Sequence, residues 1–192
     1  MPNRALELVS RTTTSITVRA INLPAGAAGV NWYLGTSTSS MPFVESWDGV
    51  TNGATASYTL YGLQPNTLYY VKFLPYDAYG GRLDPAHTDA FATQWQWDSD
   101  VTSGAEFGMT AAEFNRFIDL VFATATAKGI SLSGSASSYY VTRGTDMLAS
   151  QVNNVRSLIS TLGASVPSAA VRGSSIKASF FNGLVSSLYT LI

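Results

Sequence analysis

The chain has 192 residues, of which 46% are hydrophobic and only 12% are charged, with a formal net charge of −1. A typical soluble domain has about 25% charged residues, and a protein with so little charge repels its own copies weakly and tends to associate. No run of Lys and Arg supplies the field that nucleic-acid binding needs, so we expect no nucleic-acid partner. The absence of Cys excludes disulfides and thiolate metal sites.

The beginning of the chain, MPNRALELVS, holds no apolar signal core. No later segment approaches the run of about 18 apolar residues that a membrane-spanning helix requires. We therefore expect synthesis in a cytoplasm, without a signal peptide and without membrane insertion.

Residues 1–97 show the alternation of apolar and polar residues that is typical of short strands, as in LELV, SITVRAI, VNWYL and YYVKF. Clusters of turn residues separate these segments, which predicts an antiparallel β-sandwich. In LQPNTLYYVKF, Leu63 to Phe73, the Pro-Asn pair predicts a turn. Tyr69, Val71 and Phe73 should then share one face of a strand, with Tyr70 and Lys72 on the other.

This segment and TTTSITVRAINLP before it resemble a fibronectin type III domain over roughly Arg4 to Thr93. The resemblance implies that Tyr69 is the tyrosine corner, whose hydroxyl bonds back to the backbone upstream. The family usually places a Trp near the end of its second strand, where this chain has Ala20. Either Trp32 or Trp47 should fill that volume.

Residues 98–192 change to a helical period, which predicts a three-helix region and hence a β-plus-α chain of two domains. Thr110 and Glu113 predict a capping box at the first helix, and Gly129 its end. The second helix should run from about Leu148 to Gly163, and the third from about Ser175 to the last residue. The third has so many apolar residues that we expect another copy or a partner to cover part of them. The residues expected at this assembly surface are Phe181, Leu184, Leu188 and Leu191.

Nine residues recur at the beginnings of the three expected helices: MTAAEFNRF from 109, MLASQVNNV from 147 and IKASFFNGL from 176. Each copy holds an Ala and, four residues later, an Asn on one flank of the apolar stripe. Such an Ala lets a neighbouring helix approach closely, and such an Asn can form a hydrogen bond to that helix and fix the register of the two helices. The alternative is that each Asn is a solvated residue beside the core. The pairs are Ala111 and Asn115, Ala149 and Asn153, and Ala178 and Asn182.

An Arg-Gly pair also precedes the second and third copies, at Arg143 and Arg172. The whole pattern resembles short helical segments that recur in bacteriophage virion proteins. This resemblance implies a virion structural protein, located in the virion, whose partners are other virion proteins and its own copies.

Catalytic and metal sites are not indicated, and we expect no enzyme activity and no cofactor. His87 lies near Asp84 and Asp89 in sequence, but no motif supports a catalytic pair. The run DSDVTSG, residues 98–104, is similar to the opening of a calcium loop, but Met109 stands where the closing Glu should be.

Aromatic residues are the remaining candidates for ligand binding. Trp95 and Trp97 should lie on one strand face, where they either pack at the junction of the domains or form a platform for sugar. Trp47, Tyr76 and Tyr79 fall near expected loops and are candidate contacts to a host-surface glycan, although a packing role is equally open.

Overall fold

The computed structural model describes residues 5–48, 50, 55–84, 86–98, 109–143, 147–173 and 175–192. The chain forms two compact units, Met1–Gln94 and Trp95–Ile192. The sequence placed this boundary after Trp97. The two units are described separately below.

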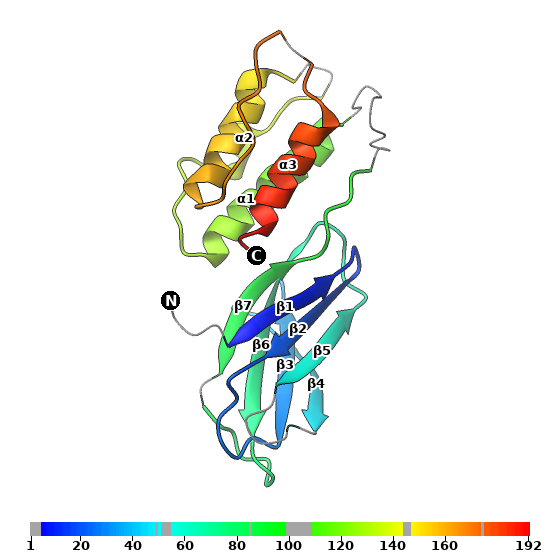
Figure 1. The fold of residues 1–192 in the computed structure, drawn as a ribbon, viewed down its shortest axis with the longest axis vertical. Helices are drawn as coiled ribbons and strands as arrows, with labels where there is room; N and C mark the ends of the chain where they lie inside the picture. The colour runs from blue at the N-terminus through cyan, green and yellow to red at the C-terminus, as the bar shows by residue number, and fades with distance from the viewer. Residues whose placement is uncertain are drawn as a thin grey trace. The chain divides into compact units, whose positions relative to one another are not determined.

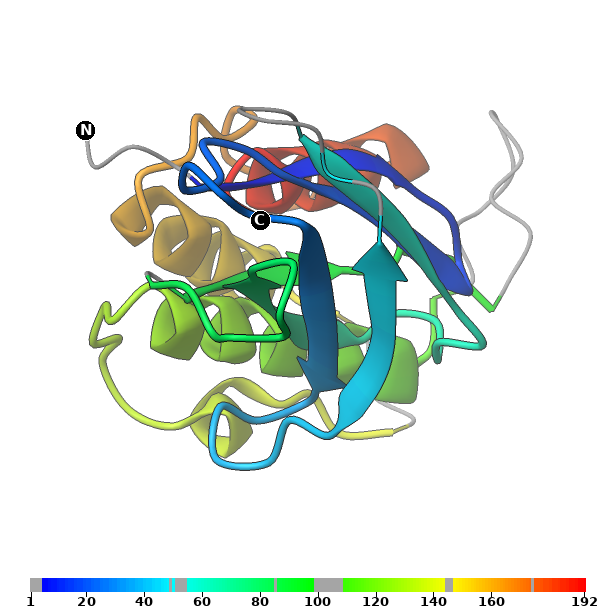
Figure 2. The same ribbon diagram turned by 90° about the horizontal axis from the view of Figure 1, so that it is seen from below.

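The first unit is a sandwich of two antiparallel sheets (Figures 1 and 2). One sheet has the strand order β1-β2-β5, and the other has the order β4-β3-β6-β7. This arrangement is a fibronectin type III-like sandwich, as the sequence predicted. The strands are β1 (Leu6–Arg11), β2 (Ser15–Ala20), β3 (Gly29–Gly35), β4 (Phe43–Asp48), β5 (Ala56–Tyr61), β6 (Leu68–Tyr76) and β7 (His87–Ala92).

The core between the sheets is centred on Trp32, whose side chain is completely buried. Trp32 belongs to the same core cluster as Ala20, whereas Trp47 is 47% exposed, so Trp32 and not Trp47 supplies a large aromatic side chain to this core. Tyr58 from the opposite sheet stacks on the Trp32 ring at a centroid distance of 5.9 Å, and Phe73 lies 6.1 Å away.

The tyrosine corner is present. The backbone N–H of Gln64 donates to the Tyr69 hydroxyl oxygen over 2.9 Å. Asn66 takes a left-handed conformation (φ 55°) that lets the chain turn into β6, and Asn is one of the few residues other than Gly that tolerate it. Tyr69, Val71 and Phe73 are buried while Tyr70 and Lys72 are half-buried, so the predicted division of faces is confirmed.

The second unit contains α1 (Ala111–Ala127), a short 3₁₀ helix η1 (Ala136–Tyr139), α2 (Ala149–Thr161) and α3 (Ala178–Tyr189). Figures 1 and 2 show the three α-helices side by side with their N-terminal ends together. The predicted capping box at the first helix is confirmed. Gly129 and Gly163, with φ of 65° and 93°, follow the ends of α1 and α2.

Two expectations about the last helix are wrong. It begins at Ala178 and ends at Tyr189, so it is shorter than the sequence suggested. Phe181, Leu184 and Leu188 are buried within the chain itself, and Leu191 is half-buried beyond the helix end. The helix therefore does not present the surplus of apolar surface that was expected to require another subunit. Among the described residues, no helix is both long enough and apolar enough to cross a membrane.

Trp95 and Trp97 do not lie on a strand, because β7 ends at Ala92. They belong to the helical unit and pack on its helices. Trp95 is buried and meets the Phe117 ring edge-on at 5.3 Å, and Trp97 lies 6.2 Å from Phe181. A buried Trp95 cannot serve as part of an exposed sugar platform.

Candidate functional site

The repeated nine residues mark the beginning of each helix. Ala111, Ala149 and Ala178 are the first helical residues of α1, α2 and α3. Two apolar residues of each repeat then occupy the two positions of a hydrophobic staple: the Met or Ile two residues before the Ala, and the Phe or Val three residues after it. A hydrophobic staple fixes the angle at which the chain enters a helix. The repeat is thus a helix-start motif. Its Ala occupies the first helical position, and Ala has a high helix propensity.

Two of the repeated Asn residues each hold a segment outside the helices through paired hydrogen bonds. Asn115 Nδ2 donates to the Val141 carbonyl oxygen (3.1 Å), and the Val141 N–H donates to Asn115 Oδ1 (2.9 Å). Asn153 does the same with Ala170, over 2.9 and 2.8 Å. The partners are backbone groups of segments outside any helix or strand. We call each of these pairings an asparagine clamp.

The two clamps are equivalent in sequence as well as in geometry. Val141 lies eight residues before Ala149, and Ala170 lies eight residues before Ala178. Each Asn therefore fixes the segment that leads into the next helix. Asn182 of α3 departs from this pattern, because its Oδ1 accepts the Trp97 indole N–H over 2.9 Å. Trp97 lies ahead of α1, so the third Asn also contacts a segment that leads to a helix.

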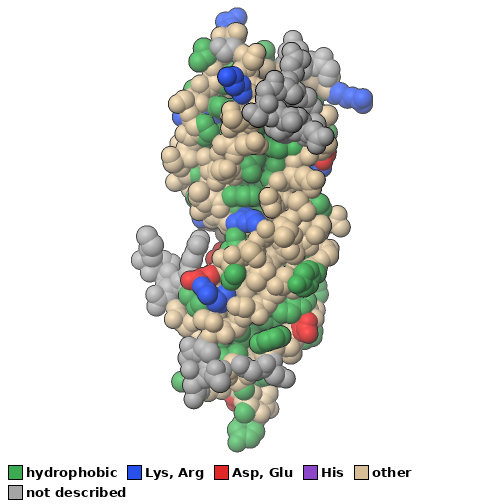
Figure 3. All heavy atoms as spheres, turned by 45° about the vertical axis from the view of Figure 1, so that its right-hand side comes forward, with side chains coloured by type: hydrophobic (Ala, Val, Ile, Leu, Met, Phe, Trp, Pro, Cys, Tyr) green, Lys and Arg blue, Asp and Glu red, His purple; other side chains and the backbone are tan. Residues whose placement is uncertain are grey.

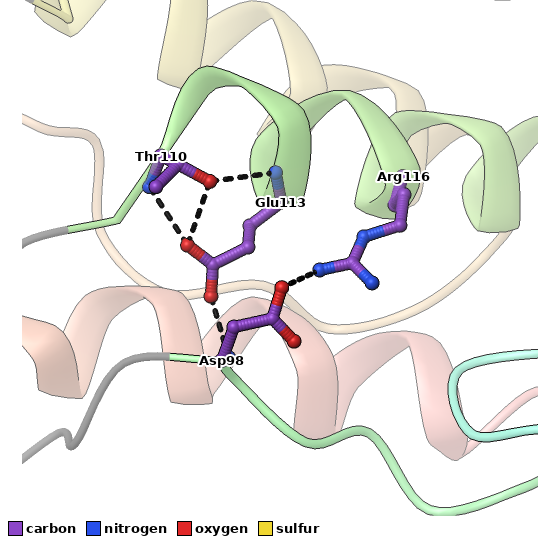
Figure 4. Close-up of polar contacts among 4 residues, drawn as sticks. All are labelled: Asp98, Thr110, Glu113 and Arg116. Carbon is purple, nitrogen blue, oxygen red and sulfur yellow. Dashed lines mark hydrogen bonds and ion pairs between the residues drawn. The ribbon is translucent and has the colours of Figure 1, made fainter.

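Glu113 in α1 joins the helix to the chain that precedes it (Figure 4). Its carboxylate is completely buried and accepts the backbone N–H of Asp98 (2.6 Å), the backbone N–H of Thr110 (2.8 Å) and the Thr110 hydroxyl (2.9 Å). Arg116 forms an ion pair with the Asp98 carboxylate. The sequence revealed the capping box but not the bond to Asp98, because that contact spans 15 positions.

A metal site is not supported by what the structure describes. Asp98 is bound to Arg116, and the rest of the calcium-like run, residues 99–104, lies outside the described residues. No group of three His, Asp or Glu side chains that could hold a metal ion occurs within the described ranges.

His87 is not part of a catalytic pair in the described structure. Its ring stacks on Phe73 at 5.5 Å. Asp84 pairs with Arg82 over 3.1 Å, and the Asp89 carboxylate accepts the Ala90 N–H over 2.9 Å. The two nearby carboxylates are therefore engaged elsewhere.

Trp47 lies near the end of β4, Tyr76 is the last residue of β6, and Tyr79 follows it. Figure 1 shows that β4 and β6 end at the same end of the sandwich. Tyr79 is 98% exposed. It sits on a turn held by the Asp77 carboxylate, which accepts the backbone N–H groups of Tyr79 (2.9 Å) and Gly81 (2.7 Å). The ring of Tyr76 lies over Gly29, where a Cβ atom would come within 2.2 Å of it.

Trp47 and Tyr76 do not form one flat platform. Trp47 pairs across the sheet with Val30, which is buried, and Tyr76 pairs with Gly29 in the adjacent row. Adjacent rows point to opposite faces of a sheet. Phe43, on the same edge strand as Trp47, is also more than half exposed. The sequence did not indicate Phe43 as an exposed aromatic residue, because apolar and polar residues alternate in an edge strand as they do in a covered strand.

An open depression lies where the three helices begin. Its lining includes Met109, Met147 and Ile176, the first residue of each repeated motif, together with Arg143 and Arg172. Figure 3 shows one face of the molecule, on which Lys, Arg, Asp and Glu side chains are few. Two arginines thus line the same depression.

Neither a protein-family model nor a curated protein sequence matches the chain. Solved structures similar to it include the sixth fibronectin type III domain of human fibronectin type III domain containing protein 3. That structure has 21% identity and a TM-score of 0.38, and the match covers 52% of this chain and 88% of that chain.

A second similar structure is the sensor domain of the anti-sigma factor RsgI4 from Pseudobacteroides cellulosolvens, with 18% identity and a TM-score of 0.35, covering 48% of this chain and 93% of that chain. A third comprises the FN1–FN3 domains of chicken CNTN1, with 16% identity and a TM-score of 0.38, covering 47% of this chain and 31% of that chain. The resemblance of the helical repeats to bacteriophage virion proteins stays a prediction.

Proposed function

We propose that this chain is a non-enzymatic structural protein of a bacteriophage virion, acting as a head or tail decoration, a fibre component or an adaptor. The fibronectin type III-like fold of the first unit is consistent with a binding or adhesion module. The observation that supports the proposal best is the helix-start motif, which occurs three times in one helical unit and resembles segments of virion proteins. The low charge of the chain fits a subunit of an assembly.

In this proposal the helical unit attaches the chain to the particle and the sandwich is displayed. The attachment cannot use the apolar face of α3, since that face is covered by the chain itself. It has to use side chains that remain exposed in the helical unit. Tyr140, Leu148 and Val171 are the exposed large hydrophobic residues in the described part of the unit.

The proposal is tested on intact particles. Antibodies against this chain should label purified virions in electron micrographs, and mass spectrometry of the same particles should find the chain in a fixed ratio to the other virion proteins. A chain that stays in the cleared lysate while the particles remain unlabelled would contradict the proposal.

A second candidate function is a carbohydrate-binding module for attachment to a host surface. It is favoured by Tyr79, a fully exposed aromatic ring on a turn whose backbone is fixed by Asp77. Exposed loop residues on a rigid scaffold are common binding positions.

Binding to host cell walls or to a glycan array tests this candidate. Trp47→Ala or Tyr79→Ala should abolish the signal while the circular dichroism spectrum is unchanged. Tyr61→Ala removes a tyrosine that is 78% exposed on β5 of the other sheet, so it is a matched control and should leave binding intact. Absence of binding by the unmodified protein would remove the candidate.

A further inference from the structure

All three repeats contribute apolar side chains to the mixed lining of the depression at the helix beginnings. Met109, Met147 and Ile176 are each only half-buried there. Leu148, which also lines the depression, is 58% exposed. Apolar side chains that gather in a hollow and remain accessible are typical of a surface that binds another apolar group.

Two basic residues also belong to the described lining of the depression. Arg143 and Arg172 precede the second and third helices at equivalent positions, six residues before Ala149 and Ala178. Both are exposed, and neither forms an ion pair with any described residue. Among the described residues of the lining there is no Asp or Glu. The two arginines that the structure describes in this lining would complement negative charge on a ligand.

We propose that the depression binds a short acidic peptide segment of a neighbouring protein. The segment inserts an apolar side chain among Met109, Met147 and Ile176, and its carboxylates face Arg143 and Arg172. Arg is well suited to this partner, because its guanidinium group pairs with a carboxylate through two parallel hydrogen bonds. A nucleic acid would supply negative charge but no apolar side chain, so it fits only half of the lining.

This inference rests on the proposed function, since a particle subunit has to bind a neighbour through its helical unit. It names the chemistry of that neighbour. Its test uses only the purified chain. If the peptide does not bind, the labelling of virions is unaffected. If the chain is absent from virions, a measured peptide affinity remains valid.

The experiment is a calorimetric titration of the full-length chain with three blocked peptides. The first carries Leu-Phe flanked by two Asp on each side, the second replaces Leu-Phe by Ser-Ser, and the third replaces every Asp by Lys. We expect the first peptide to bind and the other two to bind at least about tenfold more weakly, because one has lost the apolar contact and the other the charge complementarity.

Variants of the chain locate the site. Arg143→Gln combined with Arg172→Gln should weaken the first peptide by about tenfold or more, and Leu148→Ser should also weaken it. Lys128→Gln with Lys177→Gln removes the same charge from residues that do not line the depression, and should leave the affinity within about twofold. No binding of the first peptide, equal binding of all three, or an equal loss in both double variants would overturn the proposal.

Discussion

The asparagine clamp in α2 offers a direct test of what the repeated Asn does. Asn153 is half-buried and makes both bonds to Ala170, while its neighbour Asn154 is exposed on the same helix. Asn153→Ala and Asn154→Ala therefore remove the same chemical group from adjacent positions. They change helix propensity equally, and only the first removes a contact.

The expected loss follows from the two hydrogen bonds. A typical intramolecular hydrogen bond contributes about 0.5–1.5 kcal/mol net, so the pair is worth about 1–3 kcal/mol. Ala170 is itself only half-buried, so water can partly replace the lost amide. We therefore expect Asn153→Ala to lower the free energy of unfolding of the helical unit by about 1–2 kcal/mol relative to Asn154→Ala.

Urea unfolding followed by far-ultraviolet circular dichroism measures this difference, since the helices dominate the signal. Amide hydrogen exchange gives a local measure, because the Ala170 N–H should lose its protection in Asn153→Ala and keep it in Asn154→Ala. Equal unfolding free energies in the two variants, with an Ala170 amide that exchanges rapidly even in the unmodified protein, would refute the clamp.

Three further predictions concern single hydrogen-bonded groups. Tyr69→Phe should cost roughly 1 kcal/mol of stability, because the Gln64 N–H loses its acceptor, as urea unfolding of the sandwich would show. Glu113→Gln should destabilise the helical unit by about 1.5–3 kcal/mol in thermal unfolding, since an amide nitrogen replaces one of two buried acceptor oxygens. The hydrogen bond to the Glu45 carboxylate, with burial, raises the pKa of Tyr58 to about 12, so Glu45→Gln should lower it in an absorbance titration.

The Tyr69 and Glu113 predictions each have a control variant. Tyr70→Phe changes the next residue, whose side chain lies on the other face of β6, and should be neutral. Glu7→Gln breaks an exposed ion pair with Arg19 and should cost less than about 1 kcal/mol. Equal losses of stability in Tyr69→Phe and Tyr70→Phe, or in Glu113→Gln and Glu7→Gln, would contradict the assigned roles.

The sign of the Tyr58 effect is fixed by the direction of its pKa shift. The pKa in the folded chain lies above the ordinary value of 10.0, so the contribution to stability is complete below that pH. It is lost as the pH rises from 10.0 to about 12. A stability profile that is the same for Glu45→Gln and the unmodified chain across this range would show that the pair does not contribute.

Local features of the fold could be read from the sequence because they depend on residues close together in the chain. The period-2 alternation predicted the strands, and the change to a helical period predicted where the helices would follow. The Leu63 to Phe73 segment predicted both the turn and the buried face of β6, and Thr110 with Glu113 predicted the start of α1. Each pattern satisfies its backbone groups or buries its apolar side chains within a few positions.

Only the tertiary structure determined what those elements contact. Asn115 and Asn153 were recognised as a repeated feature, but their partners, Val141 and Ala170, lie 26 and 17 positions away in irregular segments that have no period of their own. Sequence reasoning also overestimated the exposed apolar surface of α3. The apolar stripe of one helix does not show how much of that stripe will be buried. Two other helices and the packed Trp97 cover it here, and burial is a property of the whole packed unit.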